Sequence, residues 1–158
     1  MTAQPRHRFE HQDSEQTLAE GLAEYFAGNP GLERGASLSP AARDFFRAHD
    51  AVHVVYGCGT AMPDEAVVKL ASLFGTTGGT SVLRGYLLQE SMRIYRRVPL
   101  AGTVIALLAA PWLIVRTLLR CLRQQRRWPW FGHEQYLAVP LREIRASFGI
   151  KVARPGRR

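Results

Sequence analysis

Residues 39–57 read SPAARDFFRAHDAVHVVYG, and this stretch decides the fold class. Ser39 precedes a proline at the first helical position, which is a strong start signal because the serine hydroxyl can accept a hydrogen bond from a free backbone N–H group. The apolar residues that follow recur at helical spacing, and Gly57 is a typical helix stop. The stretch therefore predicts a helix from Ser39 to Gly57 with one face buried in a core.

The same helical spacing recurs on both sides of this stretch, without an alternating strand pattern of useful length. Further helices are expected over 18–26 behind an Asp13-Ser14 cap, from about 63 to 74, over 82–96, from 100 to about 127, and over 141–148. A chain of 158 residues has the size of one domain. We therefore expect an all-α fold, a single compact helical domain of about six helices at 13–150, between a flexible N-terminal tail (1–12) and a basic C-terminal tail (151–158).

His49, Asp50 and His53 lie close together in the predicted helix over 39–57. Each helical residue advances by about 100°, so these three side chains fall within one quadrant of the helix surface. Glu65 follows His53 after 11 intervening residues, across a glycine turn that can fold it back over the histidines. Neutral imidazoles with carboxylates are preferred ligands of zinc-like divalent ions. The four residues form a candidate metal site, and an Asp–His pair that only holds helices together fits the same spacing.

Two other metal chemistries fit the residues less well. A zincin needs glutamate at position 50 as its base, where this chain has the shorter Asp50. A phosphohydrolase built on a His-Asp doublet needs a further upstream histidine and a downstream aspartate. His7 and His11 lie in a polar tail, and no aspartate follows Asp64.

Charge is distributed unevenly along the chain. Residues 1–90 carry a net charge of −4 and residues 91–158 a net charge of +12, so the basic part is expected to face an anionic partner. An uncharged run of 18 residues, 98–115, precedes arginines at helical spacing and then two tryptophans and a phenylalanine: Arg116, Arg120, Arg123, Arg127, Trp128, Trp130 and Phe131. Such an order is typical of an anchor at a membrane interface, and a solvated charged face beside two core tryptophans is the alternative.

The apolar run is a weak candidate for a membrane span. Eighteen helical residues reach about 27 Å, which barely covers the hydrocarbon layer of a bilayer, and two prolines interrupt them. A buried or lipid-facing helix is the expected interpretation. The first 16 residues contain no apolar stretch, so we expect no secretory signal. The two cysteines, Cys58 and Cys121, do not make a disulfide framework and fit a reducing compartment.

The pattern His-Asp-x-x-His-x(11)-Glu, formed here by His49, Asp50, His53 and Glu65, resembles the metal-binding signature of the Coq4 family of ubiquinone biosynthesis proteins. Its flanks agree, because residues 53–57 resemble the family's His-Val-x-x-Gly element. Residues 140–150 resemble its closing Pro-Leu-x-x-x-Arg-x-x-x-Gly-Ile element. The chain departs from the family at Asp64, where a glycine is common, and in the stretch 100–127, which is unusually apolar and then arginine-rich.

The resemblance implies an all-α, membrane-peripheral protein that binds a divalent metal, usually zinc, through His49, Asp50, His53 and Glu65. It implies a polyprenylated aromatic quinone precursor as ligand, removal of its C1 carboxyl group as the activity, and other quinone-biosynthesis proteins as partners. The location implied is the cytoplasmic face of the inner membrane in a bacterium, or the matrix face in a mitochondrion. Assembly of the chain as a homodimer is a further open alternative.

Two rival functions are weighed against this one. The first is a non-catalytic, lipid-binding scaffold for quinone-biosynthesis enzymes, in which the metal only ties two helices together. The second is a nucleic-acid-binding module, suggested by the basic C-terminal part. No recognised nucleic-acid motif is present and the arginines adjoin an apolar run, so nucleic acid is not expected as a partner.

Overall fold

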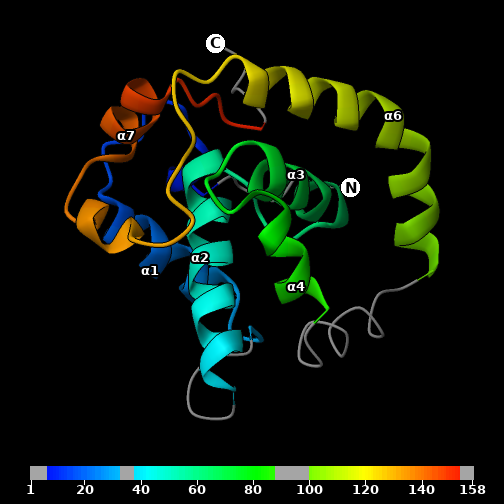
Figure 1. The fold of residues 1–158 in the computed structure, drawn as a ribbon, viewed down its shortest axis with the longest axis horizontal. Helices are drawn as coiled ribbons and strands as arrows, with labels where there is room; N and C mark the ends of the chain where they lie inside the picture. Colours follow the sequence, from blue (N-terminus) through cyan, green and yellow to red (C-terminus); the bar gives the residue numbers. More distant parts are fainter. Residues whose placement is uncertain (1–6, 33–37, 88–99, 154–158) are drawn as a thin grey trace.

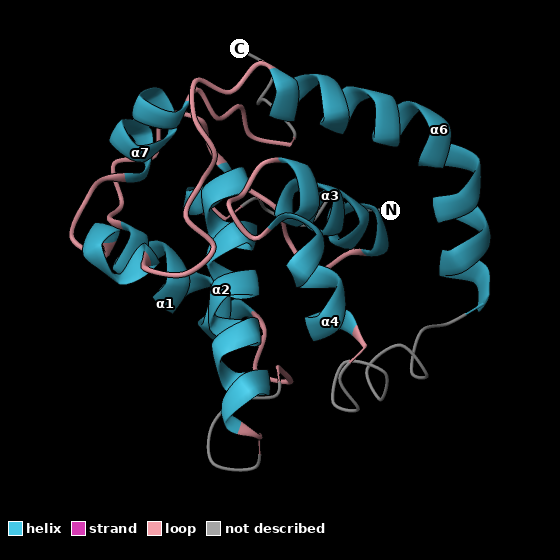
Figure 2. Ribbon diagram, viewed as in Figure 1, coloured by secondary structure: helices cyan, strands magenta, loops and turns pink. Residues whose placement is uncertain are grey.

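The computed structural model describes residues 7–32, 38–87 and 100–153, and the prediction of an all-α domain is confirmed in them (Figures 1 and 2). Six α-helices are present in these residues: α1 Leu18–Gly28, α2 Pro40–Tyr56, α3 Met62–Phe74, α4 Val82–Tyr86, α6 Leu100–Leu122 and α7 Leu141–Phe148. Short 3-10 helices add single turns: η1 Arg8–Glu10, η2 Gly79–Ser81 and η3 His133–Tyr136. Strand-like pairing in the described ranges is limited to the isolated bridges Thr17–Pro140 and Thr76–Trp128.

Helix α2 is the central element of the fold. Its residues 48–56 are all buried, and it packs against α1, α3, α4 and α7 (Figure 1). The predicted signals explain its ends. The Ser39 hydroxyl accepts a hydrogen bond from Ala42 N–H at 3.2 Å, and Pro40 is the first helical residue. At the other end Gly57 adopts the left-handed conformation (φ 63°) that favours glycine.

The turn after α2 determines where α3 begins. Glycine is required at this position for two reasons. The backbone is left-handed, and a Cβ atom on Gly57 would lie only 2.9 Å from the Val152 side chain. The Cys58 N–H donates to the His53 carbonyl at 2.8 Å and closes the helix end. Helix α3 starts five residues after Gly57, and its first turn lies against the C-terminal part of α2.

Helix α1 begins later than its predicted cap. The N-cap is Thr17, whose hydroxyl accepts from Glu20 N–H while the Glu20 carboxylate accepts from Thr17 N–H, a complete capping box. The Asp13-Ser14 cap was therefore wrong. The Ser14 and Gln16 carbonyls accept from the N–H groups of residues 142 and 141, the first two residues of α7, and Thr17 forms an isolated bridge with Pro140. The segment before α1 is therefore paired with the start of α7.

The packed structure extends beyond the residues expected for the domain. Phe9, in the N-terminal segment predicted as a tail, is fully buried, and so is Val152 at the other end. Both segments are held through Arg145 of α7 and through Gln12, whose side chain bonds the backbone of residues 150 and 152. The predicted boundaries at residues 13 and 150 thus fall inside the packed part of the chain.

Helix α6 lies along the outside of the molecule and packs against α3 (Figure 1). It contains Pro111, changes direction along its length, and ends at Leu122, before the predicted end near residue 127. Among the described residues, no helix combines the length and apolarity that a bilayer span requires. Helix α4 ends at Tyr86, and the remainder of the helix predicted over 82–96 falls outside the described residues from position 88 onward.

The tryptophans after α6 belong to the core. Trp128 and Trp130 are buried, and Trp128 exchanges backbone hydrogen bonds with Gly75 and Thr77. Of the three aromatics predicted as an interface anchor, only Phe131 is exposed. The alternative of two core tryptophans is therefore correct.

Candidate metal centre

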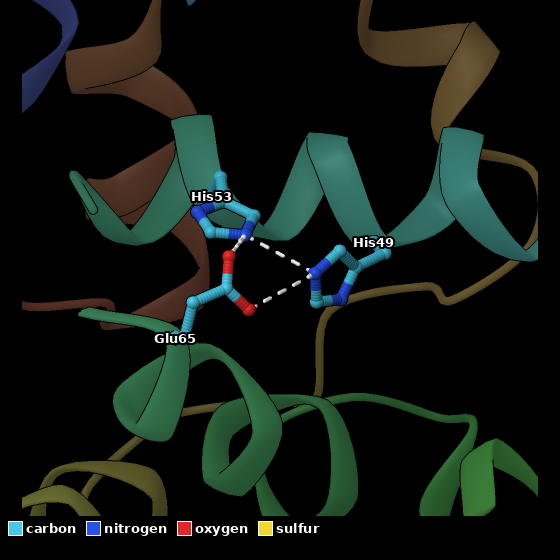
Figure 3. Close-up of side chains that lie close together, drawn as sticks. All are labelled: His49, His53 and Glu65. Atoms are coloured by element: carbon cyan, nitrogen blue, oxygen red, sulfur yellow. Dashed lines mark hydrogen bonds and ion pairs between the residues drawn. The ribbon is translucent and has the colours of Figure 1, made fainter. Parts of the chain in front are cut away.

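Three side chains from two helices converge at one point. His49 and His53 lie one turn apart on α2, and Glu65 reaches them from the first turns of α3 (Figure 3). One ligand atom from each residue lies within 4.8 Å of the other two. The short turn after Gly57 makes this convergence possible, because it brings the start of α3 back alongside the end of α2.

The distances between the donor atoms suit a small tetrahedral ion. The two Nε2 atoms are 3.1 Å apart, and the Glu65 carboxylate oxygens lie 3.2 Å from His53 Nε2 and 3.7 Å from His49 Nε2. Two ligands at about 2.05 Å from a zinc ion, separated by a tetrahedral angle, lie about 3.3 Å from each other. The separations are close to this value, with each histidine facing a different Glu65 oxygen, so an ion bound by all three residues would lie between the two imidazoles and the carboxylate.

The tautomer of His53 follows from its second hydrogen bond. Its Nδ1 lies 2.9 Å from the Gly59 carbonyl oxygen, which can only accept, so Nδ1 carries a proton and donates it. The Nε2 atom is left facing Glu65 and His49. A histidine oriented by a backbone carbonyl in this way is the usual arrangement of a metal ligand.

His49 has a different second partner. Its Nδ1 lies 3.3 Å from the Tyr86 hydroxyl on α4, and its ring stacks against Phe45 at 5.8 Å. Burial lowers the pKa of His49, and the hydrogen bond with Glu65 offsets only part of that effect. The imidazole is therefore neutral near pH 7, as a metal ligand must be.

His53 and Glu65 shift each other's pKa in opposite directions. Burial lowers the pKa of His53, but the hydrogen bond and negative charge of Glu65 outweigh it and raise the pKa above its usual value. Burial raises the pKa of Glu65, but the hydrogen bonds from the two histidines outweigh it and hold the pKa well below its usual range. Both shifts come from the attraction between the imidazole and the carboxylate, and a divalent ion bound here would supply positive charge at the same point.

The centre is open on the Glu65 side. The side chain of His53 is fully buried and that of His49 is 10% exposed, whereas that of Glu65 is 26% exposed. Two histidines and one glutamate with one accessible side form the donor set of catalytic zinc sites, in which a water molecule or substrate takes the fourth position.

Asp50 is the one predicted ligand that lies outside the converging set. It is buried on α2 next to His49, and its negative charge contributes to the raised pKa of His53. It therefore acts on the centre through its charge in this structure, and its role as a direct ligand stays a prediction.

An apolar groove adjoins Phe45, and its lining does not include His49, His53 or Glu65. It has a volume of about 250 Å³, and Phe45, which stacks on His49, forms part of its wall. The other lining residues come from α2, the α4 region and the loop after α6: Ala41, Ser81, Val82, Arg84, Gly85, Trp130 and Phe131.

Sequence reasoning missed three neighbours of the centre: the Gly59 carbonyl, the Tyr86 hydroxyl and the ring of Tyr25, which stacks on His53 at 5.1 Å. Tyr25 falls in the helix predicted over 18–26, and no functional role was predicted for it. A tyrosine at a core position carries a hydroxyl that must find a polar neighbour, which is the signal that could have indicated it.

Comparisons of this chain with models of protein families, with curated proteins and with solved structures return no match.

Proposed function

We propose that this protein is a metal-dependent, Coq4-like protein that binds a polyprenylated aromatic quinone precursor at a membrane surface and removes its C1 carboxyl group. The observation that carries the proposal is the convergence of His49, His53 and Glu65. In the reaction, the bond between the ring and the carboxyl carbon breaks, carbon dioxide leaves, and a proton takes its place on the ring.

The three residues would hold a divalent ion, for which zinc suits the donor set best. When bound, the ion supplies a Lewis acid toward a carboxylate or phenolic oxygen. The protein residues orient the ligands, adjust the charge around them and exclude water. Gly59 and Tyr86 orient the two imidazoles, Asp50 adds negative charge behind His53, and the rings of Phe45 and Tyr25 exclude water from the two histidines.

The groove beside Phe45 supports an isoprenoid ligand. Its walls are largely apolar, and it adjoins the ring that stacks on His49. A chain bound in this groove would lie against apolar side chains, with Phe45 in contact with both the chain and His49. Burial of apolar chain surface contributes about 25 cal/mol per Å² to binding.

Helix α6 supplies a surface suited to an anionic membrane. Trp112, Val115, Leu119 and Leu122 recur at intervals of three, four and three residues, and all are exposed. They form an outward apolar stripe opposite the buried Thr117 and Cys121. Arg116 and Arg120 lie on α6 beside this stripe, whereas Arg123 and Arg127, predicted on the same helix face, follow in the non-helical segment after Leu122. No acidic residue occurs in the sequence between Glu90 and Glu134. Exposed apolar residues beside arginines are typical of helices that lie in a membrane interface.

Replacing two residues of this stripe should weaken membrane binding strongly. Trp112 is 70% and Leu122 80% exposed, so a Trp112→Ser/Leu122→Ser variant should fold normally but lose much of the apolar area that enters the bilayer. We expect flotation with anionic vesicles to fall at least about tenfold. The melting temperature should change little.

A charge-matched pair of variants tests the arginines. Arg120 donates to the Ala153 carbonyl at 2.7 Å and serves the fold, so the exposed Arg123 and Arg127 are the better targets. Arg123→Gln/Arg127→Gln should weaken binding by about 1 kcal/mol per residue at low salt. Arg43→Gln/Arg47→Gln on α2 removes the same charge and should have little effect. Equal loss in both variants would contradict a docking surface formed by α6 and the segment that follows it.

Replacing Asp50 distinguishes an enzyme from a scaffold. Asp50→Asn keeps the size of the side chain and removes the negative charge that acts on His53. If the centre is catalytic, turnover of a prenylated hydroxybenzoate should fall about 10–100-fold while the melting temperature changes little. Product formation is measured by mass spectrometry and the melting temperature by thermal unfolding, both at saturating zinc, for the wild type and the variant. Asp44→Asn, exposed on the same helix, is the control.

The scaffold alternative predicts the reverse result. The candidate ligands come from two helices, so an ion there would also tie α2 to α3. In that case Asp50→Asn lowers the melting temperature, and any defect in quinone biosynthesis follows from the loss of folded protein. Tight lipid binding by the wild type, without product from any prenylated phenolic acid, would overturn the catalytic proposal.

A further inference from the structure

Tyr25 is packed directly against the candidate metal centre. It lies on α1 and is fully buried, and its ring stacks on His53 with the ring centres 5.1 Å apart and the planes 28° from parallel. Phe9 meets the same ring edge-on at 6.0 Å. The phenol ring is thus held between the N-terminal segment and the innermost histidine of the centre.

The hydroxyl of Tyr25 has no hydrogen-bond partner within the described residues. Leaving a buried hydroxyl without a partner is unfavourable, and in native structures such groups often belong to binding or catalytic sites. Burial raises the pKa of Tyr25, and the negative charges of Asp50 and Glu65 raise it further. A phenol hydroxyl carries its proton at neutral pH, so this buried group has a hydrogen bond to donate.

We infer that Tyr25 is a ligand-binding residue whose hydroxyl donates a hydrogen bond to a carboxylate oxygen bound in the centre beside His53. The inference rests on the proposed function, because it needs an oxygen ligand at the site formed by His49, His53 and Glu65. It names the chemistry that the site recognises: a carboxylate, which accepts a hydrogen bond from a neutral phenol while a cation neutralises its charge.

The neighbouring groups favour this partner over a residue of the protein. Both Glu65 oxygens are already engaged, one toward each histidine. The His53 ring presents its face to Tyr25, and its two nitrogens are directed at Gly59 and at the centre.

The test uses the full-length protein loaded with Co²⁺, whose visible absorption reports changes in its ligands. Acetate, the simplest carboxylate, is titrated into wild type and Tyr25→Phe. The dissociation constant of acetate should rise about tenfold in the variant, because a hydrogen bond to a charged group is lost. The affinity for Co²⁺ should stay the same, and the melting temperature should stay the same or rise, because the unpartnered buried hydroxyl is gone.

Tyr56→Phe is the matched control. The Tyr56 hydroxyl is also buried on α2, but it donates to the Gly75 carbonyl and accepts from the Gln124 amide, away from the centre. This variant should lower the melting temperature and leave acetate affinity unchanged.

Three other results of the acetate and Co²⁺ titrations would overturn the inference. Equal acetate affinity in wild type and Tyr25→Phe overturns the inference while leaving the metal centre intact. A loss of Co²⁺ affinity in Tyr25→Phe also overturns it and makes Tyr25 a positioning residue for the carboxylates. Failure of the wild type to bind Co²⁺ overturns the proposed function together with the inference.

Discussion

His53→Ala is expected to reduce the divalent metal content of the purified protein from about one ion per chain to nearly none. His53 is the best-placed donor of the centre: it is fully buried, its Nδ1 is fixed by Gly59, and its Nε2 lies within 3.2 Å of both other groups. Without it, one imidazole and one carboxylate are left, which is too few donors for tight zinc binding. Elemental analysis after dialysis against excess zinc measures the effect.

His133→Ala is the matched control for this loss. His133 is also buried, but it lies on η3 beside Glu134 and is not part of the converging group. This variant should retain the metal. Equal metal content in wild type and His53→Ala would contradict the assignment of the centre, whereas equal loss in both histidine variants would indicate general unfolding. Circular dichroism of each variant separates these outcomes.

Arg145→Met is expected to destabilise the fold by about 3–5 kcal/mol. Arg145 is 1% exposed, and its guanidinium donates to five backbone carbonyls: Val55 and Val54 at 2.9 Å, Phe9 at 2.6 Å, and those of His11 and Gln12. Burial lowers the pKa of Arg145 to about 10, so the side chain is still charged at pH 7. Methionine fills similar volume but leaves all five carbonyls without this donor.

Urea unfolding of the metal-free protein measures this loss, with Arg142→Met as the control. Arg142 lies on the same helix, is exposed, and pairs with Glu15 at the surface, so its replacement should change the free energy of unfolding by less than about 1 kcal/mol. Arg145→Lys should fail to restore stability, because an ammonium group has three donors and cannot match the planar fork. Equal midpoints for the Arg145→Met and Arg142→Met variants would contradict a structural role for Arg145.

The hydrogen bonds of Arg145 explain the structural role of the arginine in the element at residues 140–150. Arg145 connects α7 to the end of α2 and to the N-terminal segment, so it holds together three parts of the chain that are far apart in sequence. The Phe9 carbonyl, one of its acceptors, belongs to a segment whose side chains pack against Tyr25. Loss of Arg145 is therefore expected to loosen the wall of the candidate centre as well as the fold.

Local signals in the sequence were sufficient for the helices that carry the centre. The Ser39-Pro40 start and the Gly57 stop predicted α2 to within one residue at each end, and the spacing of His49 and His53 placed both on one face. These features depend on backbone geometry and on neighbours within one turn, so they can be read without knowledge of the tertiary fold. Glu65 was also predictable, because the turn between the two helices is short.

Only the tertiary structure decided what surrounds those ligands. Thr17, and not Asp13-Ser14, caps α1, because the preceding segment pairs with the start of α7. Tyr25 lies on the face of His53, and Trp128 is in the core. The outward direction of Trp112 on α6 follows from the way that helix packs on α3. Each of these depends on contacts between residues far apart in the chain, and helical periodicity tells which residues share a face but not which neighbour that face will meet.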